Sequence, residues 1–202
     1  MNNETTEQKL AKYHEFFSIE DNFSINILPI AADKGVSFEQ FLSDMPIPFK
    51  MASDMSSIDQ AALRPLQALS GVASQLVDFL NHQSTKIDLL IGYILSQQDD
   101  EQHRYQGLKF GGGGLLFSAT QTFKLAQLLE MKVFLANENC AVYCYGEVIE
   151  IQQKLDIYLH KVIFHFIRED DREVLVRTSL HQQSKQLQLL AKQRDQETQK
   201  KD

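Results

Sequence analysis

The feature that most constrains the fold of this chain is a series of mostly apolar residues spaced alternately three and four positions apart. This series, here called the seam, comprises Leu69, Ala73, Leu76, Leu80, Gln83, Ile87, Leu90 and Ile94. A mean spacing of 3.5 residues keeps one side of a helix turned toward a partner helix, as in a left-handed coiled coil. Gln83 is polar where leucine would give more stability, and such seam residues fix register and oligomeric state.

The helix that carries the seam is predicted to run from Leu66 to Ser96, with Pro65 in its first turn. At about 1.5 Å per residue it would be roughly 45 Å long, which exceeds what the domain after it can cover. A second apolar line beside the seam favours a bundle over an isolated dimer. It comprises Val72, Phe79, Leu89 and Tyr93. Two arrangements remain open: self-association through the seam, which we favour, and an internal bundle with the N-terminal helices.

Residues 1–55, which precede this helix region (56–98), read as a helical and extended segment. Helical spacing covers residues 5–17, and "NFSINILPI" alternates as a short strand or extended segment that Pro29 ends. Ser37, with Glu39 and Gln40 close behind it, is a plausible cap for a short helix.

Residues 99–195 are predicted to form a small antiparallel β-barrel with a closing helix, so the fold class is α+β. Four runs rich in β-branched and aromatic residues read as strands: "GLLFSA", "MKVFLAN", "AVYCYGEVIEIQ" and "DIYLHKVIFHFI". Gly146 suits a bulge in the longest run. The closing helix opens on acidic residues and carries Val176, Leu180, Gln183, Leu187 and Leu190 on one side. We expect fraying from about Asp195 and a disordered tail over 196–202.

Composition and charge exclude several functional classes. With 27 acidic against 20 basic residues the net charge is −7, so no basic face for nucleic acid is expected. No apolar stretch reaches the about 18 residues of a membrane span, and the polar N-terminus lacks a signal-peptide pattern, which predicts a cytoplasmic protein. Cys140 and Cys144 read as buried thiols and not as a zinc site or disulfide. The histidines have no catalytic motif around them, so we expect no enzymatic activity and no metal.

Four consecutive glycines, Gly111 to Gly114, raise the question of phosphate binding. A P-loop would place Gly-Lys-Ser/Thr after them, whereas Leu-Leu-Phe follows here. A dinucleotide-binding turn would lead into a helix, but this run leads into a predicted strand. A flexible linker would have polar flanks, whereas Leu108, Phe110, Leu115 and Phe117 surround the run. A tight backbone turn at the entrance to a strand remains.

From this turn onward the chain resembles the PilZ family of cyclic-di-GMP receptors. The resemblance rests on "KFGGGGLLF", "MKVFLAN", "YGEVIEI", "LHKVIFHFI" and "DDREVLVRTSLHQQSK". It implies a barrel opened by an Asp/Asn-x-Ser-x-x-Gly turn, with an Arg-x-x-x-Arg upstream that pairs with the ligand phosphates. Here Gly113 and Gly114 keep the turn, but Lys109 stands at the acidic position and Gly111 at the serine.

The upstream segment "SQQDDEQHRYQ" contains Arg104 as its only arginine. Three acidic residues close by, Asp99, Asp100 and Glu101, would repel a dianionic ligand. Cyclic-di-GMP is therefore the ligand that the resemblance implies, and we expect its binding to be weak or absent.

An atypical subset of the family, which lacks the ligand motifs and assembles as tetramers through a long heptad helix, matches most of the chain. This likeness implies a non-enzymatic, homo-oligomeric adaptor or regulator with other signalling proteins as partners, in motility, pili or biofilm control. Two alternatives remain: a receptor that binds cyclic-di-GMP through a non-consensus site at Arg104 and Lys109, and an unrelated oligomeric structural protein.

Overall fold

The computed structural model describes residues 5–31, 35–52, 72–135 and 140–199. Among the described residues, α1 (Thr6–Glu15) precedes the first strand, and α2 (Phe38–Asp44), helical residues 47–52 and α4 (Val72–Ser96) lie between the first two strands. A 3₁₀ turn, η2 (Glu101–His103), joins α4 to the barrel. The strands are β1 (Ser18–Pro29), β2 (Arg104–Gly111), β3 (Gly114–Ala119), β4 (Leu128–Leu135), β5 (Cys140–Lys154) and β6 (Ile157–Phe166). Helix α5 (Glu169–Gln199) ends the described chain.

The six strands close into a barrel in the order β1-β2-β3-β6-β5-β4, with every neighbouring pair antiparallel. Its interior is packed with branched and aromatic side chains, which removes their apolar surface from water. Fully buried members include Ile25, Phe110, Leu115, Phe117, Val133, Val148 and Val162. The α+β fold with an antiparallel barrel is therefore as the sequence predicts.

The barrel uses two strands that the sequence reading did not place in it. β1 belongs to residues 1–55, outside the expected barrel region of 99–195, yet it pairs with β2 on one side and β4 on the other. β2 was not among the four expected strands. Its alternation is broken at Gly107, where the pairing with β3 shifts register before Lys109. This bulge hides the period-2 pattern that identifies a half-buried strand.

β5 is buried on both faces because other elements cover the outside of the barrel there. Val142 and Cys144 point into the core, while Tyr143 and Tyr145 join an outer cluster with α2 and the C-terminal end of α4. Phe41 of α2 stacks on Tyr143 with ring centroids 5.6 Å apart. The predicted irregularity is present, since the register of β5 against β6 shifts at Gly146.

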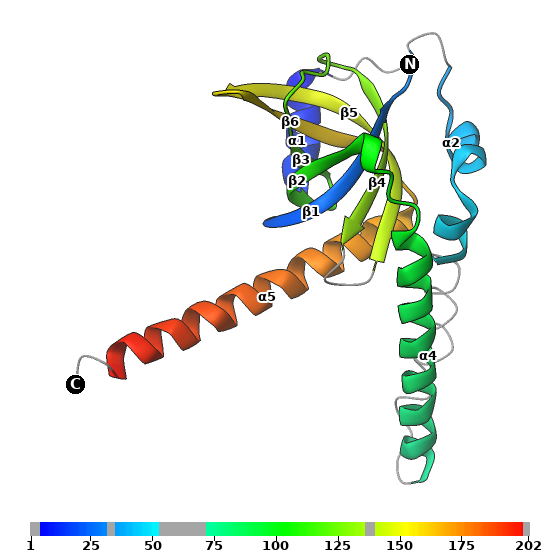
Figure 1. Ribbon diagram of the computed structural model, residues 1–202, viewed down its shortest axis with the longest axis vertical. Helices are drawn as coiled ribbons and strands as arrows, with labels where there is room; N and C mark the ends of the chain where they lie inside the picture. The colour runs from blue at the N-terminus through cyan, green and yellow to red at the C-terminus, as the bar shows by residue number, and fades with distance from the viewer. Residues whose placement is uncertain (1–4, 32–34, 53–71, 136–139, 200–202) are drawn as a thin grey trace.

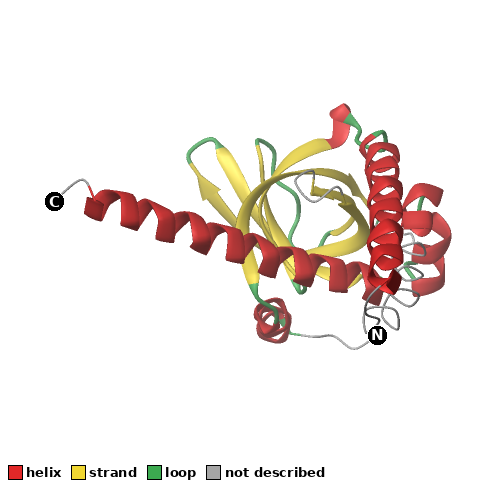
Figure 2. Ribbon diagram, turned by 90° about the horizontal axis from the view of Figure 1, so that it is seen from below, coloured by secondary structure: helices red, strands yellow, loops and turns green. Residues whose placement is uncertain are grey.

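Two long helices leave the barrel in different directions (Figure 1). α4 projects downward in that view, and α5 runs to the lower left. The view from below also shows α5 crossing beneath the barrel, with its C-terminal end extending past the barrel on the side away from α4 (Figure 2). α5 continues to Gln199, and residues 200–202 of the predicted tail lie outside the described residues.

Candidate functional site

The glycine run forms the hairpin turn between two barrel strands. β2 ends at Gly111 and β3 begins at Gly114, with Phe110 opposite Leu115 as the last pair before the turn. The backbone turn that the sequence predicts is therefore present. The turn is also tied to β6, because the Phe164 amide donates a hydrogen bond to the Gly113 carbonyl at 3.1 Å.

Close approach by other backbone segments explains glycine at three of the four positions, and the side chains of Val176 and Phe16 crowd the fourth, Gly112. A Cβ at Gly111 would lie 2.2 Å from the Phe17 carbonyl oxygen, and one at Gly113 would lie 2.7 Å from the Tyr13 carbonyl oxygen. At Gly114 the nearest obstacle would be the Val162 carbonyl oxygen, at 2.1 Å. Ordinary contacts between carbon and other heavy atoms are about 3.5–4 Å, so the absence of side chains is required for packing.

Helices α1 and α5 occupy the surface of this turn. Arg172, in the first turns of α5, donates a hydrogen bond from Nη1 to the Gly112 carbonyl at 2.5 Å and lies 5.5 Å from the Phe16 ring centroid. Tyr13 is packed against Gly114, and its burial raises the pKa of the phenol to about 12. The hairpin is thus an internal docking surface for two helices and leaves no room for a serine at Gly111.

The stretch "DDREVLVRTSLHQQSK" entered the sequence analysis through the family resemblance, and the structure gives its Asp171 and Arg172 a role. Asp171 is buried and accepts a hydrogen bond from Arg168 Nε at 2.9 Å. Arg168 Nη2 also donates to the Phe49 carbonyl at 2.8 Å. Arg172 on Gly112 thus fastens the start of α5 to the barrel, and Arg168 ties it to the segment that follows α2. The role of Tyr13, from a distant helix, had no local signal in the sequence.

Arg104, the arginine of the segment upstream of the glycine turn, is engaged by acidic neighbours. Its Nε donates to both Asp99 carboxylate oxygens, at 2.9 and 3.1 Å, and Glu101 lies 3.7 Å from Nη1. The hydrogen bond that Arg104 donates to the Asp99 carboxylate raises the pKa of the guanidinium. The acidic residues before β2, which the sequence predicts to repel an anion, therefore also bind Arg104, the cation that would attract the anion.

The same cluster fixes α4 to the barrel through Asn26 of β1. The Asn26 amide nitrogen donates to Asp99 Oδ1 at 2.8 Å and to the Asp100 carbonyl at 3.0 Å. The Asp100 amide donates back to Asn26 Oδ1 at 2.7 Å. Since Asn26 is buried, these three bonds satisfy its side chain and hold the end of α4 against β1. Arg104 thus belongs to a structural joint.

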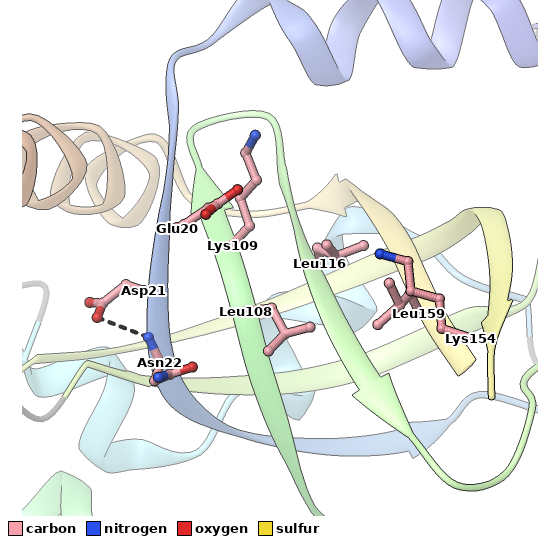
Figure 3. A pocket seen from close by; sticks show the side chains of 8 residues that line it. All are labelled: Glu20, Asp21, Asn22, Leu108, Lys109, Leu116, Lys154 and Leu159. Atoms are coloured by element: carbon pink, nitrogen blue, oxygen red, sulfur yellow. Dashed lines mark hydrogen bonds between the residues drawn. The ribbon is translucent and has the colours of Figure 1, made fainter. Parts of the chain in front are cut away.

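Lys109 lies in a separate groove on the outside of the barrel, shown in Figure 3. The groove has a volume of about 520 Å³ and is lined by Glu20, Asp21, Asn22, Leu108, Lys109, Leu116, Lys154 and Leu159. Lys109 is five residues along β2 from Arg104, which places their Cα atoms roughly 16 Å apart at about 3.3 Å per residue. Two lysines and two acids line the groove. It therefore offers neither a guanidinium nor a net positive charge for a cyclic dinucleotide.

The seam lies on α4, with most of its described side chains at the surface. Leu69 lies outside the described residues, and for Ala73 only the helical backbone is described. Leu76 is 60% exposed, Leu90 65% and Ile94 48%, while Leu80 and Ile87 are exposed to a smaller degree and Gln83 is half-buried. Neither α1 nor α2 covers these positions.

A different side of α4 faces its own chain. Leu95 and Val77 are buried, and Ile91 packs into the outer cluster with α2 and β5. Val77, Ile91 and Leu95 lie on one face of α4, next to the face that carries the seam. The second apolar line is also exposed where it is described, with Phe79 at 58% and Tyr93 at 66%. α4 therefore presents a broad apolar surface that no described part of its own chain covers.

Among the described residues, no helix is both long and apolar enough to cross a membrane. Within the same residues, no three His, Cys, Asp or Glu side chains are grouped as metal ligands. Cys140 and Cys144 are free thiols, and burial raises the pKa of Cys144.

Comparison with known proteins identifies the class of fold. No family model matches the sequence, and no curated protein matches it. Among solved structures, a tetrameric PilZ domain protein from Xanthomonas campestris, self-assembled through a helical bundle, is similar over 88% of this chain and 96% of its own, with a TM-score of 0.52 at 14% identity. A Bacillus subtilis inhibitor of motility is similar over 85% of this chain and 52% of its own, with a TM-score of 0.46 at 8% identity.

The molecule is thus a closed six-stranded barrel flanked by long helices, and its fold is PilZ-like. The resemblance predicted from "KFGGGGLLF", "YGEVIEI" and the closing helix is confirmed at the level of the fold.

Proposed function

We propose that this chain is a non-enzymatic, cytoplasmic PilZ-like protein of cyclic-di-GMP signalling that self-assembles through α4 and acts by contacts with other proteins. Its own binding of cyclic-di-GMP is weak or absent. The observation that carries the proposal is the exposed seam: its leucines and isoleucines repeat at coiled-coil spacing on a helix that projects from the barrel.

Exposed apolar surface on this scale marks an interaction site in a soluble protein. The seam has the periodicity that a second copy of the same helix matches, and its polar Gln83 supplies a layer that selects one register. The Xanthomonas campestris protein of similar fold is a tetramer self-assembled through a helical bundle. That assembly supports a tetramer as the form of this chain.

Three features of the structure support weak or absent binding of cyclic-di-GMP. Arg104 is bound to Asp99, Gly111 lies against the Phe17 carbonyl where a serine would clash, and Lys109 shares its groove with Glu20 and Asp21. A dianionic ligand would have to displace one of these acids from its cation. The barrel therefore serves as a platform for α4 and α5.

Light scattering on two matched double variants tests the seam. Leu76→Asp with Leu80→Asp buries two charges in an assembled seam and should reduce the particle to a monomer. Asn81→Asp with Thr85→Asp adds the same charge on another exposed side of α4 and should leave the mass unchanged. If the seam variant keeps the mass of the parent, the seam packs inside one chain and self-assembly through it is wrong.

The competing function, a cyclic-di-GMP receptor, is favoured by one observation: Lys109 and Lys154 line a single groove. Isothermal titration with cyclic-di-GMP separates the two. We expect no saturable heat up to about 100 μM, which corresponds to binding weaker than about −5.5 kcal/mol. Micromolar binding that is lost in Arg104→Ala or Lys109→Ala, and kept in Lys124→Ala as a surface control, would make the chain a receptor.

A further inference from the structure

The loop between β3 and β4, residues 120–127, is anchored to one end of the barrel by an aromatic side chain. Phe123 of this loop is 8% exposed and belongs to the main core. Its ring packs edge to face against Tyr105 of β2 and Phe117 of β3, with 5.6 and 5.5 Å between ring centroids. Phe123 therefore closes this end of the barrel as an aromatic plug.

His160 of β6 is bonded to the backbone of this plug. The buried His160 ring stacks on Phe117 with 4.8 Å between centroids and meets the Phe123 ring edge to face at 5.2 Å. The Phe123 amide donates a hydrogen bond to His160 Nε2 at 3.1 Å. A ring nitrogen that accepts a hydrogen bond carries no proton, so His160 is neutral, with its proton on Nδ1.

The other ring nitrogen, Nδ1, is buried and has no hydrogen-bond partner of ordinary geometry among the described residues. A buried donor without a partner destabilises the folded state, so such a group in a native protein calls for an explanation. Burial lowers the pKa of His160, while a backbone contact with Tyr158 acts in the opposite direction. The closed barrel therefore holds this ring in its neutral form.

The elements around the ring bring no charge that would pair with its protonated form. On either side of β6, the cross-strand partners of His160 are the apolar residues Phe117 and Ile151. The titratable side chains that flank the ring on these elements and on the loop are Tyr105, Lys124, Glu150, Tyr158 and Lys161. Glu150 is bonded to Lys161, and within the described chain no carboxylate forms an ion pair with His160.

The second half of the loop is tied down independently of the plug. The Ala126 amide donates to the Val148 carbonyl of β5 at 2.8 Å, and the Val148 amide donates to the Gln127 carbonyl at 3.0 Å. The Lys124 amide also donates to Gln127 Oε1 at 2.7 Å, and the Gln127 amide donates back to the Lys124 carbonyl at 3.1 Å. Residues 124–127 thus form a closed turn that is fixed to β5.

The first half of the loop, residues 120–123, relies on the barrel end itself. Besides the plug and the bond to His160, it is held by a hydrogen bond from Gln121 Nε2 to the Tyr105 hydroxyl at 3.0 Å. That bond lies at the surface, where water competes for both groups. The contact between Phe123 and His160 is therefore the main attachment of this half.

We infer that His160 is a proton-sensitive latch that holds residues 120–123 on the end of the barrel. A proton on Nε2 turns the acceptor of the Phe123 amide into a second donor, so the hydrogen bond is lost and two N–H groups face each other. A charged ring without a partner also has to reach water, which requires the Phe123 side chain to move out. Acidification then releases residues 120–123 and exposes the rings of Tyr105 and Phe117, while residues 124–127 stay on β5.

Fluorine NMR of the full chain, with fluorophenylalanine placed only at position 123, tests the latch. We expect one buried signal near neutral pH and a second, solvent-exposed signal that grows below the ordinary histidine pKa of about 6.5. Because one proton drives the change, the ratio of exposed to buried signal should rise by up to about tenfold per pH unit.

Two matched variants identify the titrating group. In His160→Gln the side-chain amide can still accept the Phe123 hydrogen bond but takes up no proton, so the buried signal should persist to about pH 5. His103→Gln, which removes a histidine of the η2 turn that is bonded to Asp100, should titrate like the parent chain.

A second label separates release of the loop from unfolding of the barrel. Fluorophenylalanine at Phe41, in the outer cluster with Tyr143, should keep its signal while that of position 123 changes. Equal opening in the parent and in His160→Gln would overturn the inference. So would a signal at position 123 that is constant down to about pH 5, or one that changes in step with the signal of Phe41.

Discussion

Replacement of Gly111 by serine should destabilise the barrel and create no ligand site. Serine is the residue that the family resemblance implies at this position. Its Cβ would lie 2.2 Å from the Phe17 carbonyl oxygen and 3.0 Å from the Ser18 Cα. The first distance is more than an ångström shorter than an ordinary contact of about 3.5 Å. Because the obstacle is backbone at the α1–β1 junction, a side-chain rotation cannot relieve it.

The size of the loss follows from the cost of overpacking, about 1–3 kcal/mol, and the backbone obstacle places it near the upper value. In a chain of this length each kcal/mol lowers the melting temperature by about 2–4 °C, so we expect a decrease of roughly 6–12 °C. Thermal and urea unfolding monitored by circular dichroism would measure it.

Gly35→Ser provides the matched control, because a Cβ at Gly35 meets nothing within 4 Å. Like Gly111→Ser, Gly35→Ser reduces the conformational entropy of the unfolded chain, which favours the folded state by about 0.4–1 kcal/mol when the native conformation is compatible. If Gly111→Ser is as stable as Gly35→Ser, or if it binds cyclic-di-GMP, the packing account of the glycine hairpin is wrong.

Three further predictions concern single residues. Burial lowers the pKa of His160, so on acidification the unfolded chain binds a proton that the folded chain does not. The free energy of unfolding should therefore fall as the pH drops below about 6.5, and this dependence on pH should be shallower in His160→Gln. Asn26→Ala removes three hydrogen bonds between β1 and the end of α4, and it should lower the free energy of unfolding, measured in urea, by about 1–3 kcal/mol. A loss smaller than that caused by Arg104→Ala would contradict the role of Asn26 in holding α4. Leu155 is 93% exposed and has a φ of 52°, a backbone conformation that disfavours a residue with a Cβ. Replacing Leu155 with glycine should therefore stabilise the protein by up to about 1 kcal/mol. A lower melting temperature of the variant would show that the Leu155 side chain packs.

Local patterns in the sequence predicted the elements whose signals are periodic. Ser37 caps α2 by accepting a hydrogen bond from the Gln40 amide at 3.1 Å, as its position before Glu39 and Gln40 indicates. The seam identified the exposed side of α4, because a helix with 3.5-residue spacing keeps one side constant. The acidic first turn of α5 marked the start of the closing helix at Glu169.

Features that depend on distant contacts had no such signal. β1 closes the barrel by pairing with β2 and β4, which lie about eighty or more residues away in sequence. The alternation of apolar and polar residues in β1 therefore could not show which strands it pairs with. The glycine run indicated a turn, but not that Tyr13 and Phe17 approach it from the N-terminal segment. In the same way, the acidic residues before the barrel indicated repulsion of an anion but not the hydrogen bonds that tie Asp99 to both Asn26 and Arg104.

The central claim is that α4 assembles the protein independently of cyclic-di-GMP. Sedimentation equilibrium of the full chain, with and without the dinucleotide, tests it most directly. One chain has a mass of 23.2 kDa, and the account predicts a multiple of this mass, expected to be fourfold, that the ligand does not change. A particle of 23.2 kDa at about 100 μM, or a mass that changes when cyclic-di-GMP is added, would contradict it.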